Sequence, residues 1–139
     1  DGTLDNFKKE RYSSFENGVV SIDYKELYGQ EELKKLVRHF KGDETGVDIT
    51  DEFDIEGEGT FTERFVTYTE PTIENGVIET DGVKIVFDPT KGVASYTVEQ
   101  RALELDGEGN VKKGSDVYCI NIDAYMPANS FSFRVEVSK

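Results

Sequence analysis

The sequence predicts an all-β fold: an antiparallel two-layer β-sandwich of roughly nine strands, with at most a short helical turn near residues 25–32. Three observations predict it. Apolar and polar residues alternate over many short segments, turn signals recur about every 8 to 12 residues, and hardly any segment has the period of an amphipathic helix. These features together are typical of stacked antiparallel sheets.

The length of 139 residues fits one domain, and a globular chain of this size buries about two-thirds of the surface that its unfolded form exposes. Trp is absent, but 9 Phe and 7 Tyr provide large side chains for a core. We divide the chain into a lead-in segment, residues 1–18, and a single β-sandwich domain, residues 19–139. The lead-in is weakly periodic and suits a short edge strand.

The first part of the domain contains one clear strand and one ambiguous segment. Alternation begins at Val19 in VVSID, and KELYGQEE then interrupts it with a single helical turn. The segment 33–42, LKKLVRHFKG, fits two structures. Its apolar residues fall at helical spacing, while Leu36, Arg38 and Phe40 would also line one face of a strand.

A half-buried antiparallel strand is predicted between residues 46 and 55, because its apolar residues share one parity. These residues are Val47, Ile49, Phe53 and Ile55, and the opposite parity holds Asp48, Thr50, Glu52 and Asp54. The carboxylates of DITDEFDIEGE would suit an acid pair. We interpret them instead as the solvated face of a sheet.

The centre of the chain predicts a strand and a meander. A strand occupies TFTERFVTYTE and ends at Pro71, which cannot continue a central ladder. The dipeptides Asn75-Gly76 and Asp81-Gly82 favour the positive φ angles of tight hairpin turns. Three short strands therefore follow one another over 71–74, 77–80 and 83–88.

The last third predicts three strands. ASYTVEQRALELD forms one strand, interrupted by a bulge, and the polar, Gly-rich segment 106–115 is a hairpin loop. The penultimate strand places Tyr118, Ile120, Ile122 and Ala124 on one face, and the final strand contains Phe131, Phe133, Val135 and Val137.

The charge of the chain excludes several partners. Acidic residues outnumber basic ones 29 to 16, giving a net charge of -13, which repels nucleic acid and anionic membranes. The sequence contains no apolar run of about 18 residues, which is the length that would predict a membrane span. The single cysteine, Cys119, lies among apolar residues and is interpreted as a core residue. The chain starts at Asp1 without Met, so we expect a processed or excised part of a longer protein, with its compartment left open.

Few residues suggest chemistry, and no catalytic residue, metal ligand or cofactor is assigned. The only histidine, His39, would serve as a general base, but a strand residue without such a role is the simpler interpretation. Arg38 and Arg64 would clamp a carboxylate or pair across strands. We take Arg38, His39 and Tyr68 as candidate substrate-binding residues.

The segment DGEGN is similar to the opening of a calcium-binding loop, because oxygen-bearing side chains occupy Asp106, Glu108 and Asn110. The glutamate that closes such a loop is missing, since Val117 occupies its position. We therefore interpret the segment as an ordinary hairpin tip.

The order of several segments resembles the C-terminal β-sandwich region of heparinase II/III-like proteins, which are polysaccharide lyases and their relatives. The segments are SIDYKELYG, LKKLVRHFKGDETGVDITDEFDIEG and ERFVTYTEPTIENGVIETDGVKIVFD. Within them lie a "Leu-Asp-Leu-x-x-x-Tyr" type strand with its Tyr-containing turn, an aromatic-x-Arg strand, an "Ile-Thr-Asp-x-Phe" strand and a "Phe-Val-Thr…Pro" strand. Leu36 stands where a Trp is common, two residues before the Arg. The resemblance favours a strand at 33–42.

The resemblance implies that an α-helical toroid precedes this domain and that the parent protein cleaves uronate-containing glycans by β-elimination. In such lyases the catalytic Tyr and His lie mostly upstream, so this chain would be a non-catalytic scaffold and one wall of the substrate cleft. Its partners would be the upstream toroid and a polysaccharide. Two alternatives stay open. One is a purely structural interaction domain, and the other is a free-standing carbohydrate-binding or adhesion module that uses Tyr12, Tyr24, Tyr68 and Tyr125.

Overall fold

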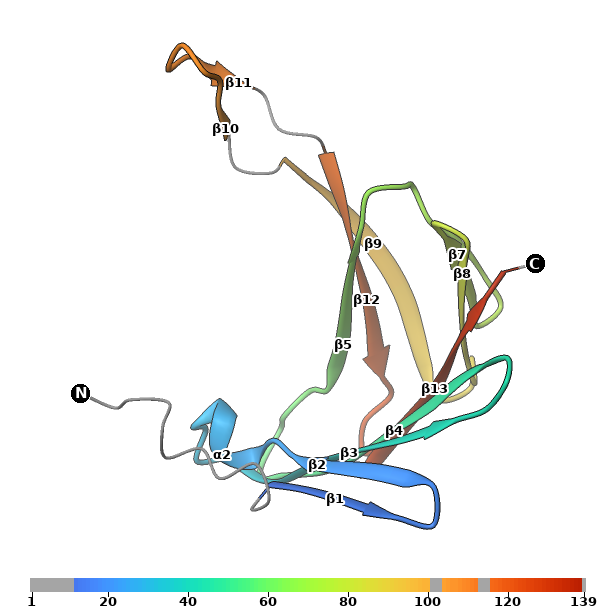
Figure 1. Cartoon of the computed structure of the whole chain (residues 1–139). Helices are drawn as coiled ribbons and strands as arrows, with labels where there is room; N and C mark the ends of the chain where they lie inside the picture. The colour runs from blue at the N-terminus through green and yellow to red at the C-terminus, as the bar shows by residue number, and fades with distance from the viewer. Residues whose placement is uncertain (1–11, 101–103, 113–115, 139) are drawn as a thin grey trace.

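The computed structural model describes residues 12–100, 104–112 and 116–138. It confirms an all-β protein with two stacked antiparallel sheets (Figure 1). The large sheet has eight strands in the order β1-β2-β3-β4-β13-β8-β7-β6. These strands are β1 (Ser13–Glu16), β2 (Val19–Asp23), β3 (Leu33–Gly42), β4 (Gly46–Ile55), β6 (Thr72–Glu74), β7 (Val77–Thr80), β8 (Val83–Phe87) and β13 (Ser130–Val137).

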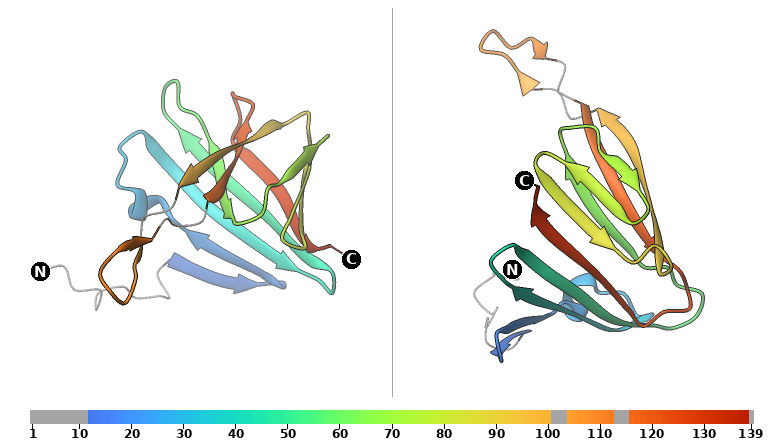
Figure 2. Two further views of the ribbon diagram at one scale, coloured as in Figure 1. Left: turned by 90° about the horizontal axis from the view of Figure 1, so that it is seen from above. Right: turned by 90° about the vertical axis from the view of Figure 1, so that its right-hand side faces the viewer.

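The small sheet has three strands in the order β5-β12-β9. They are β5 (Thr62–Thr67), β9 (Gly92–Gln100) and β12 (Asp116–Ala124). Two further strands, β10 (Glu104–Leu105) and β11 (Val111–Lys112), form a separate hairpin that extends away from both sheets (Figure 2). The predicted helical turn is α2 (Lys25–Tyr28), which ends at Gly29 with a φ of 56°.

The core lies between the two sheets and consists of aliphatic and aromatic side chains. Phe53, Ile78, Ile120 and Ile122 are almost fully buried. Aromatic contacts join the layers, because Phe65 of β5 meets Phe133 of β13 edge-on with ring centroids 5.5 Å apart. Such pairs add to the free energy gained by burying the rings.

Tight turns fix the register of the hairpins. Asn75-Gly76 and Asp81-Gly82 all have positive φ angles, between 47° and 79°, and connect β6 to β7 and β7 to β8, as predicted. Asn17-Gly18 has the same property and connects β1 to β2. β1 is therefore the short edge strand for which the lead-in segment is suited.

The ambiguous segment 33–42 is a strand, β3, which pairs with β2 and β4. Within the described ranges there are 13 strands rather than roughly nine, because the short strands β1, β10 and β11 add to the expected set. β9 ends at Gln100, and the bulge expected in that strand falls on residues outside the described ranges.

One expectation about β4 is wrong. The carboxylates of DITDEFDIEGE do not all lie on the solvated face, because Asp51 shares the parity of Ile49 and Phe53 and points into the sandwich. Asp51 is only 1% exposed. A buried carboxylate requires a charged or hydrogen-bonding partner, and β3 supplies one.

Candidate functional site

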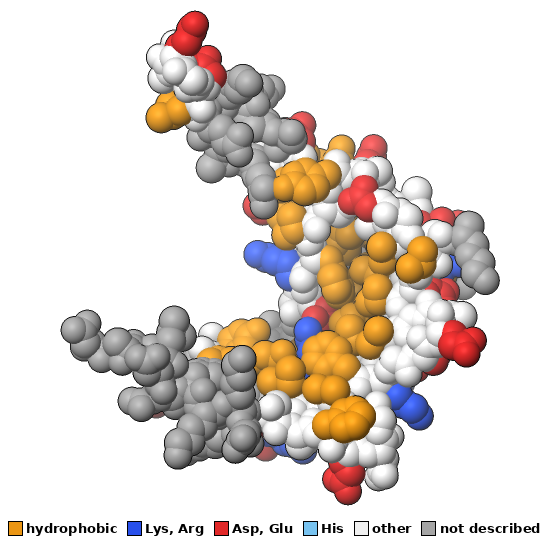
Figure 3. Space-filling view, in the orientation of Figure 1, with side chains coloured by type: hydrophobic (Ala, Val, Ile, Leu, Met, Phe, Trp, Pro, Cys, Tyr) orange, Lys and Arg blue, Asp and Glu red, His pale blue; other side chains and the backbone are white. Residues whose placement is uncertain are grey.

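A groove with a volume of about 840 Å³ lies between β3 and β4 of the large sheet and β5 of the small sheet. The groove exists because the small sheet covers only part of the large sheet, and β5 is the edge strand of the small sheet at this boundary. Figure 3 shows the hollowed side of the molecule, where hydrophobic side chains gather along the inner surface. The groove has both apolar and charged walls.

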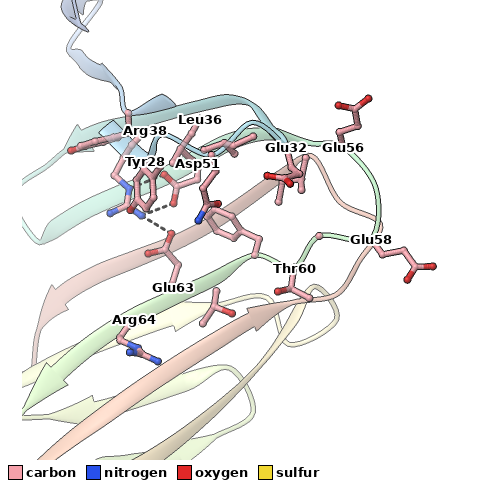
Figure 4. A pocket seen from close by; sticks show the side chains of 17 residues that line it. Tyr28, Glu32, Leu36, Arg38, Asp51, Glu56, Glu58, Thr60, Glu63 and Arg64 are labelled. Carbon is pink, nitrogen blue, oxygen red and sulfur yellow. Dashed lines mark hydrogen bonds and ion pairs between the residues drawn. The ribbon is translucent and has the colours of Figure 1, made fainter. Parts of the chain in front are cut away.

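Three charged side chains form the polar part of the groove (Figure 4). Arg38 Nε donates to Asp51 Oδ1 at 2.7 Å, and Arg38 Nη2 donates to Asp51 Oδ2 at 2.6 Å. Nη2 also donates to Glu63 Oε1, which reaches up from β5. We call these three residues the Arg38 cluster. It connects the two sheets, since Arg38 and Asp51 are register partners on β3 and β4 of the large sheet and Glu63 lies on β5 of the small sheet.

Burial and neighbouring charges shift the pKa values in this cluster. The hydrogen bond to Asp51 is the main cause that holds the pKa of Arg38 above its ordinary value. Burial, followed by hydrogen bonding and repulsion from Asp51, raises the pKa of Glu63 to about 8, against the opposing pull of Arg38.

The rim of the groove is aromatic on one side and acidic on another. Tyr24 and Tyr28 border it from the helical turn, and Tyr28 is 60% exposed. Glu32, Glu56 and Glu58 border it near the connection between β4 and β5, and Figure 4 shows Glu56 and Glu58 pointing away from the Arg38 cluster. Lys34 Nζ pairs with Glu56 Oε2 at 2.8 Å, so part of the acidic charge is compensated.

His39 lies on the opposite face of the large sheet and has partners that the sequence did not reveal. Ser21 Oγ lies 2.6 Å from His39 Nδ1, and His39 Nε2 lies 3.1 Å from Glu52 Oε2. The line of hydroxyl, imidazole and carboxylate is similar to a nucleophile with its base. However, Ser21 lies within the paired strand β2, where the backbone amides serve the ladder rather than a developing oxyanion. We interpret the trio as cross-strand pairing.

The structure brings one of the three candidate binding residues, Arg38, into the groove. Tyr68 follows β5 directly and is 59% exposed, but it does not line the groove. Arg64 pairs across strands, because its Nε donates to Asn121 Oδ1 at 3.0 Å. Sequence analysis missed Asp51 and Glu63. The parity of Asp51, which matches that of its apolar neighbours, was the available signal.

The DGEGN segment forms a hairpin tip between β10 and β11. Asp106 Oδ1 accepts hydrogen bonds from the backbone N–H groups of Glu108 and Asn110, both at 2.9 Å, and these bonds lower the pKa of Asp106. The carboxylate oxygen therefore serves the turn itself. In the described ranges, no three His, Cys, Asp or Glu side chains gather as metal ligands.

The comparison with family models gave no match, and no curated protein matches the chain. Across residues 12–100, 104–112 and 116–138, no helix has the length and hydropathy needed to cross a bilayer. The groove and the Arg38 cluster therefore carry the functional argument by themselves.

Proposed function

We propose that this chain is the C-terminal β-sandwich scaffold of a heparinase II/III-like polysaccharide lyase, and that its groove contributes one wall of the substrate cleft. The parent protein would cleave uronate-containing glycans by β-elimination. The partner of the scaffold would be a helical toroid upstream in the same polypeptide. The catalytic groups would belong to other parts of that protein.

One observation carries the proposal: positions from separate motifs of the resemblance meet at the groove. Tyr24 and Tyr28 come from the first motif, Arg38 from the second and Asp51 from the third, and all four line the groove. Phe53, the last residue of the third motif, stacks on Phe61 with ring centroids 4.1 Å apart. These motifs follow one another along the chain from α2 through β3 to β4, and a shared function would explain why each contributes to the same surface.

The Arg38 cluster supports a role in shaping a wall rather than in catalysis. The guanidinium uses its Nε and Nη2 groups on Asp51 and Glu63, so it is already held by protein carboxylates. A bidentate pair of this kind fixes geometry. The Arg38 cluster would therefore keep Tyr24, Tyr28 and the groove floor in a fixed arrangement.

The experiment is to determine the coding sequence upstream of Asp1 and to express the whole product. We expect an upstream helical toroid and the formation of unsaturated uronate ends on uronate-containing glycans, followed by ultraviolet absorbance. The isolated chain serves as the control and should form none. An upstream sequence without a toroid, or a whole product that leaves these glycans intact, would contradict the proposal.

A second candidate, a carbohydrate-binding module, is favoured by the two tyrosine rings at the groove rim, because sugars bind well to aromatic faces. A screen of the isolated chain against neutral and acidic oligosaccharides tests it. Binding that is lost in Tyr28→Ala but kept in Tyr125→Ala would support the module, whereas an absence of binding would exclude it. Tyr125 is the comparison, because it is a sugar-stacking candidate from the sequence that is 53% exposed and lies outside the groove, so the pair of variants places the binding site.

A further inference from the structure

We propose that the free edge of β5 and the groove beside it bind an extended polypeptide segment as a fourth strand of the small sheet, and that this segment carries Lys or Arg residues. The inference does not depend on the scaffold role, and it gives the groove a different occupant, because a peptide strand bound beside β5 would exclude a glycan from the same space. It rests on the hydrogen-bonding edge, the apolar floor and the charge of the rim.

The edge of β5 offers backbone groups for pairing. β5 pairs with β12 over Thr62–Thr67, and in the described part of the chain no second strand pairs with it. The edge borders the groove, because consecutive residues from Thr60 to Arg64 line it. An edge strand of this kind presents a row of N–H and C=O groups to any extended chain that lies alongside.

The space beside β5 suits a strand. The large sheet continues beneath the groove with apolar side chains that contribute to its floor, namely Leu33, Leu36 and Ile55, and Phe61 lies at the β5 end. A strand added about 4.8 Å from β5 would lie about 10 Å above the large sheet, which is the spacing of stacked sheets. Every second side chain of that strand would point to the apolar floor, and the others would point to solvent.

The one inward acid on β5 does not block this arrangement. An inward-pointing charge often protects an edge strand from pairing. Glu63, however, is only 7% exposed and is already held by Arg38. The Glu63 carboxyl group is therefore bound to Arg38 and does not oppose pairing at the free edge of β5.

The rim selects the charge of the occupant. Glu32, Glu56 and Glu58 border the groove, and among the described residues only Glu56 of these three forms an ion pair, with Lys34. Two cations also line the groove, but Arg38 is held by Asp51 and Glu63, and Arg64 donates to Asn121 on β12. The net charge of -13 opposes a second copy of this chain as the occupant. An extended segment with Lys or Arg at its solvent-facing positions complements the rim.

The test uses this chain and three synthetic peptides of equal length: alternating Lys and Val, the same peptide with alternate backbone amides N-methylated, and alternating Glu and Val. Binding is measured at pH 7 by amide chemical shifts and hydrogen exchange. We expect the Lys–Val peptide to slow exchange at edge-facing amides of Thr62–Thr67 at least tenfold. The N-methylated and acidic peptides should bind at least tenfold more weakly, because one lacks the donors and the other is repelled.

Matched variants distinguish the contribution of the rim carboxylates to peptide affinity from the contribution of the overall net charge. The double variant Glu32→Gln, Glu58→Gln should weaken the Lys–Val peptide roughly five- to tenfold, as expected for two exposed ion pairs. The double variant Glu44→Gln, Glu74→Gln removes the same charge from exposed positions outside the groove and should leave the affinity unchanged.

Four results would overturn the inference: no binding of the Lys–Val peptide, equal binding of the N-methylated or acidic peptide, shift changes that avoid β5, or equal weakening by both double variants. None of them bears on the lyase proposal, which the upstream sequence tests separately. The two ideas can therefore fail independently.

Discussion

At the scale of single residues, Arg38 determines how the two sheets meet. Its guanidinium is 26% exposed, whereas the side chains of Asp51 and Glu63 are 1% and 7% exposed. A carboxylate buried this deeply is costly without a cationic partner. The cluster therefore links β5 to β3 and β4 by charge-assisted hydrogen bonds in addition to the apolar core.

Replacing Arg38 should destabilise the fold strongly. Arg38→Ala leaves Asp51 and Glu63 buried without their partner, and we expect a loss of about 3–5 kcal/mol in the free energy of unfolding. Arg64→Ala is the control, because Arg64 is exposed and donates only to Asn121, so its loss should stay within about 1 kcal/mol. Urea denaturation of the three proteins measures both values. Similar losses in the two variants would show that the cluster has no special role.

Glu63 should make the stability depend on pH. Its pKa is raised to about 8 in the folded chain from an ordinary value of 4.5, so the folded state keeps a proton that the unfolded state loses. The contribution is complete below about pH 4.5 and disappears as the pH rises toward 8, with a slope of at most about 1.4 kcal/mol per pH unit. Denaturation midpoints between pH 5 and 9 should fall more steeply in the native chain than in Glu63→Gln. Parallel curves would refute the shift.

The sequence predicted part of this cluster. Cross-strand pairing of Arg38 with an acid followed from its strand context, and the bidentate contact with Asp51 confirms it. The participation of Glu63 could not be foreseen, because it depends on β5 packing face to face with β3 and β4. No local pattern specifies which strands of two sheets lie opposite each other.

At the scale of elements, turns decide how the strands pair. Gly76, at φ 79°, closes the β6–β7 hairpin so tightly that an added Cβ would lie 2.3 Å from the carbonyl oxygen of Phe87. Gly82, at φ 73°, closes the next hairpin with open space at the same position. The two glycines share a backbone conformation and differ in their surroundings.

This pair allows a matched measurement. Gly82→Ala should cost about 1–2 kcal/mol from left-handed backbone strain alone. Gly76→Ala should cost clearly more, because the β7–β8 hairpin must also move away from the new methyl group. Thermal and urea unfolding of both variants provide the comparison. If Gly76→Ala is no worse than Gly82→Ala, the close approach at Phe87 does not constrain the hairpin.

Turn chemistry made most elements predictable from the sequence, and the exceptions have local causes. The hairpins at Asn75-Gly76 and Asp81-Gly82 follow from dipeptides that tolerate positive φ. Segment 33–42 was ambiguous because its apolar spacing fits both periods, and pairing with β2 and β4 decides it. The extra strands β1, β10 and β11 have only two to four residues each, so their alternation is too short to be recognised in the sequence.

At the scale of the whole molecule, the chain is strongly acidic and its two sheets are unequal in size. The net charge of -13 spreads over a thin two-layer body, and eight strands lie beneath only three. The net charge could be calculated directly from the amino-acid composition. The division into large and small sheets depends on contacts between distant strands, such as β4 with β13, which alternation does not specify.

Salt should stabilise the chain, because screening weakens repulsion among its carboxylates. Between about 10 mM and 150 mM salt the screening length falls from about 30 Å to about 8 Å, and the thermal midpoint at pH 7 should rise. In the double variant Glu44→Lys, Glu74→Lys the net charge changes by +4, from -13 to -9, and the rise should be smaller. A midpoint that falls with salt would mean that ion pairs outweigh repulsion.

The position of β13 has a consequence for biosynthesis. This strand lies between β4 and β8, so it alone joins the β1–β4 half of the large sheet to the β6–β8 half. On a ribosome, the earlier strands emerge first. The edges of β4 and β8 that pair with β13 stay unpaired until the polypeptide has been synthesised as far as Val137. Closure of the sheet thus follows the synthesis of the other described strands, and until then the nascent chain exposes the open edges of β4 and β8 to chaperones.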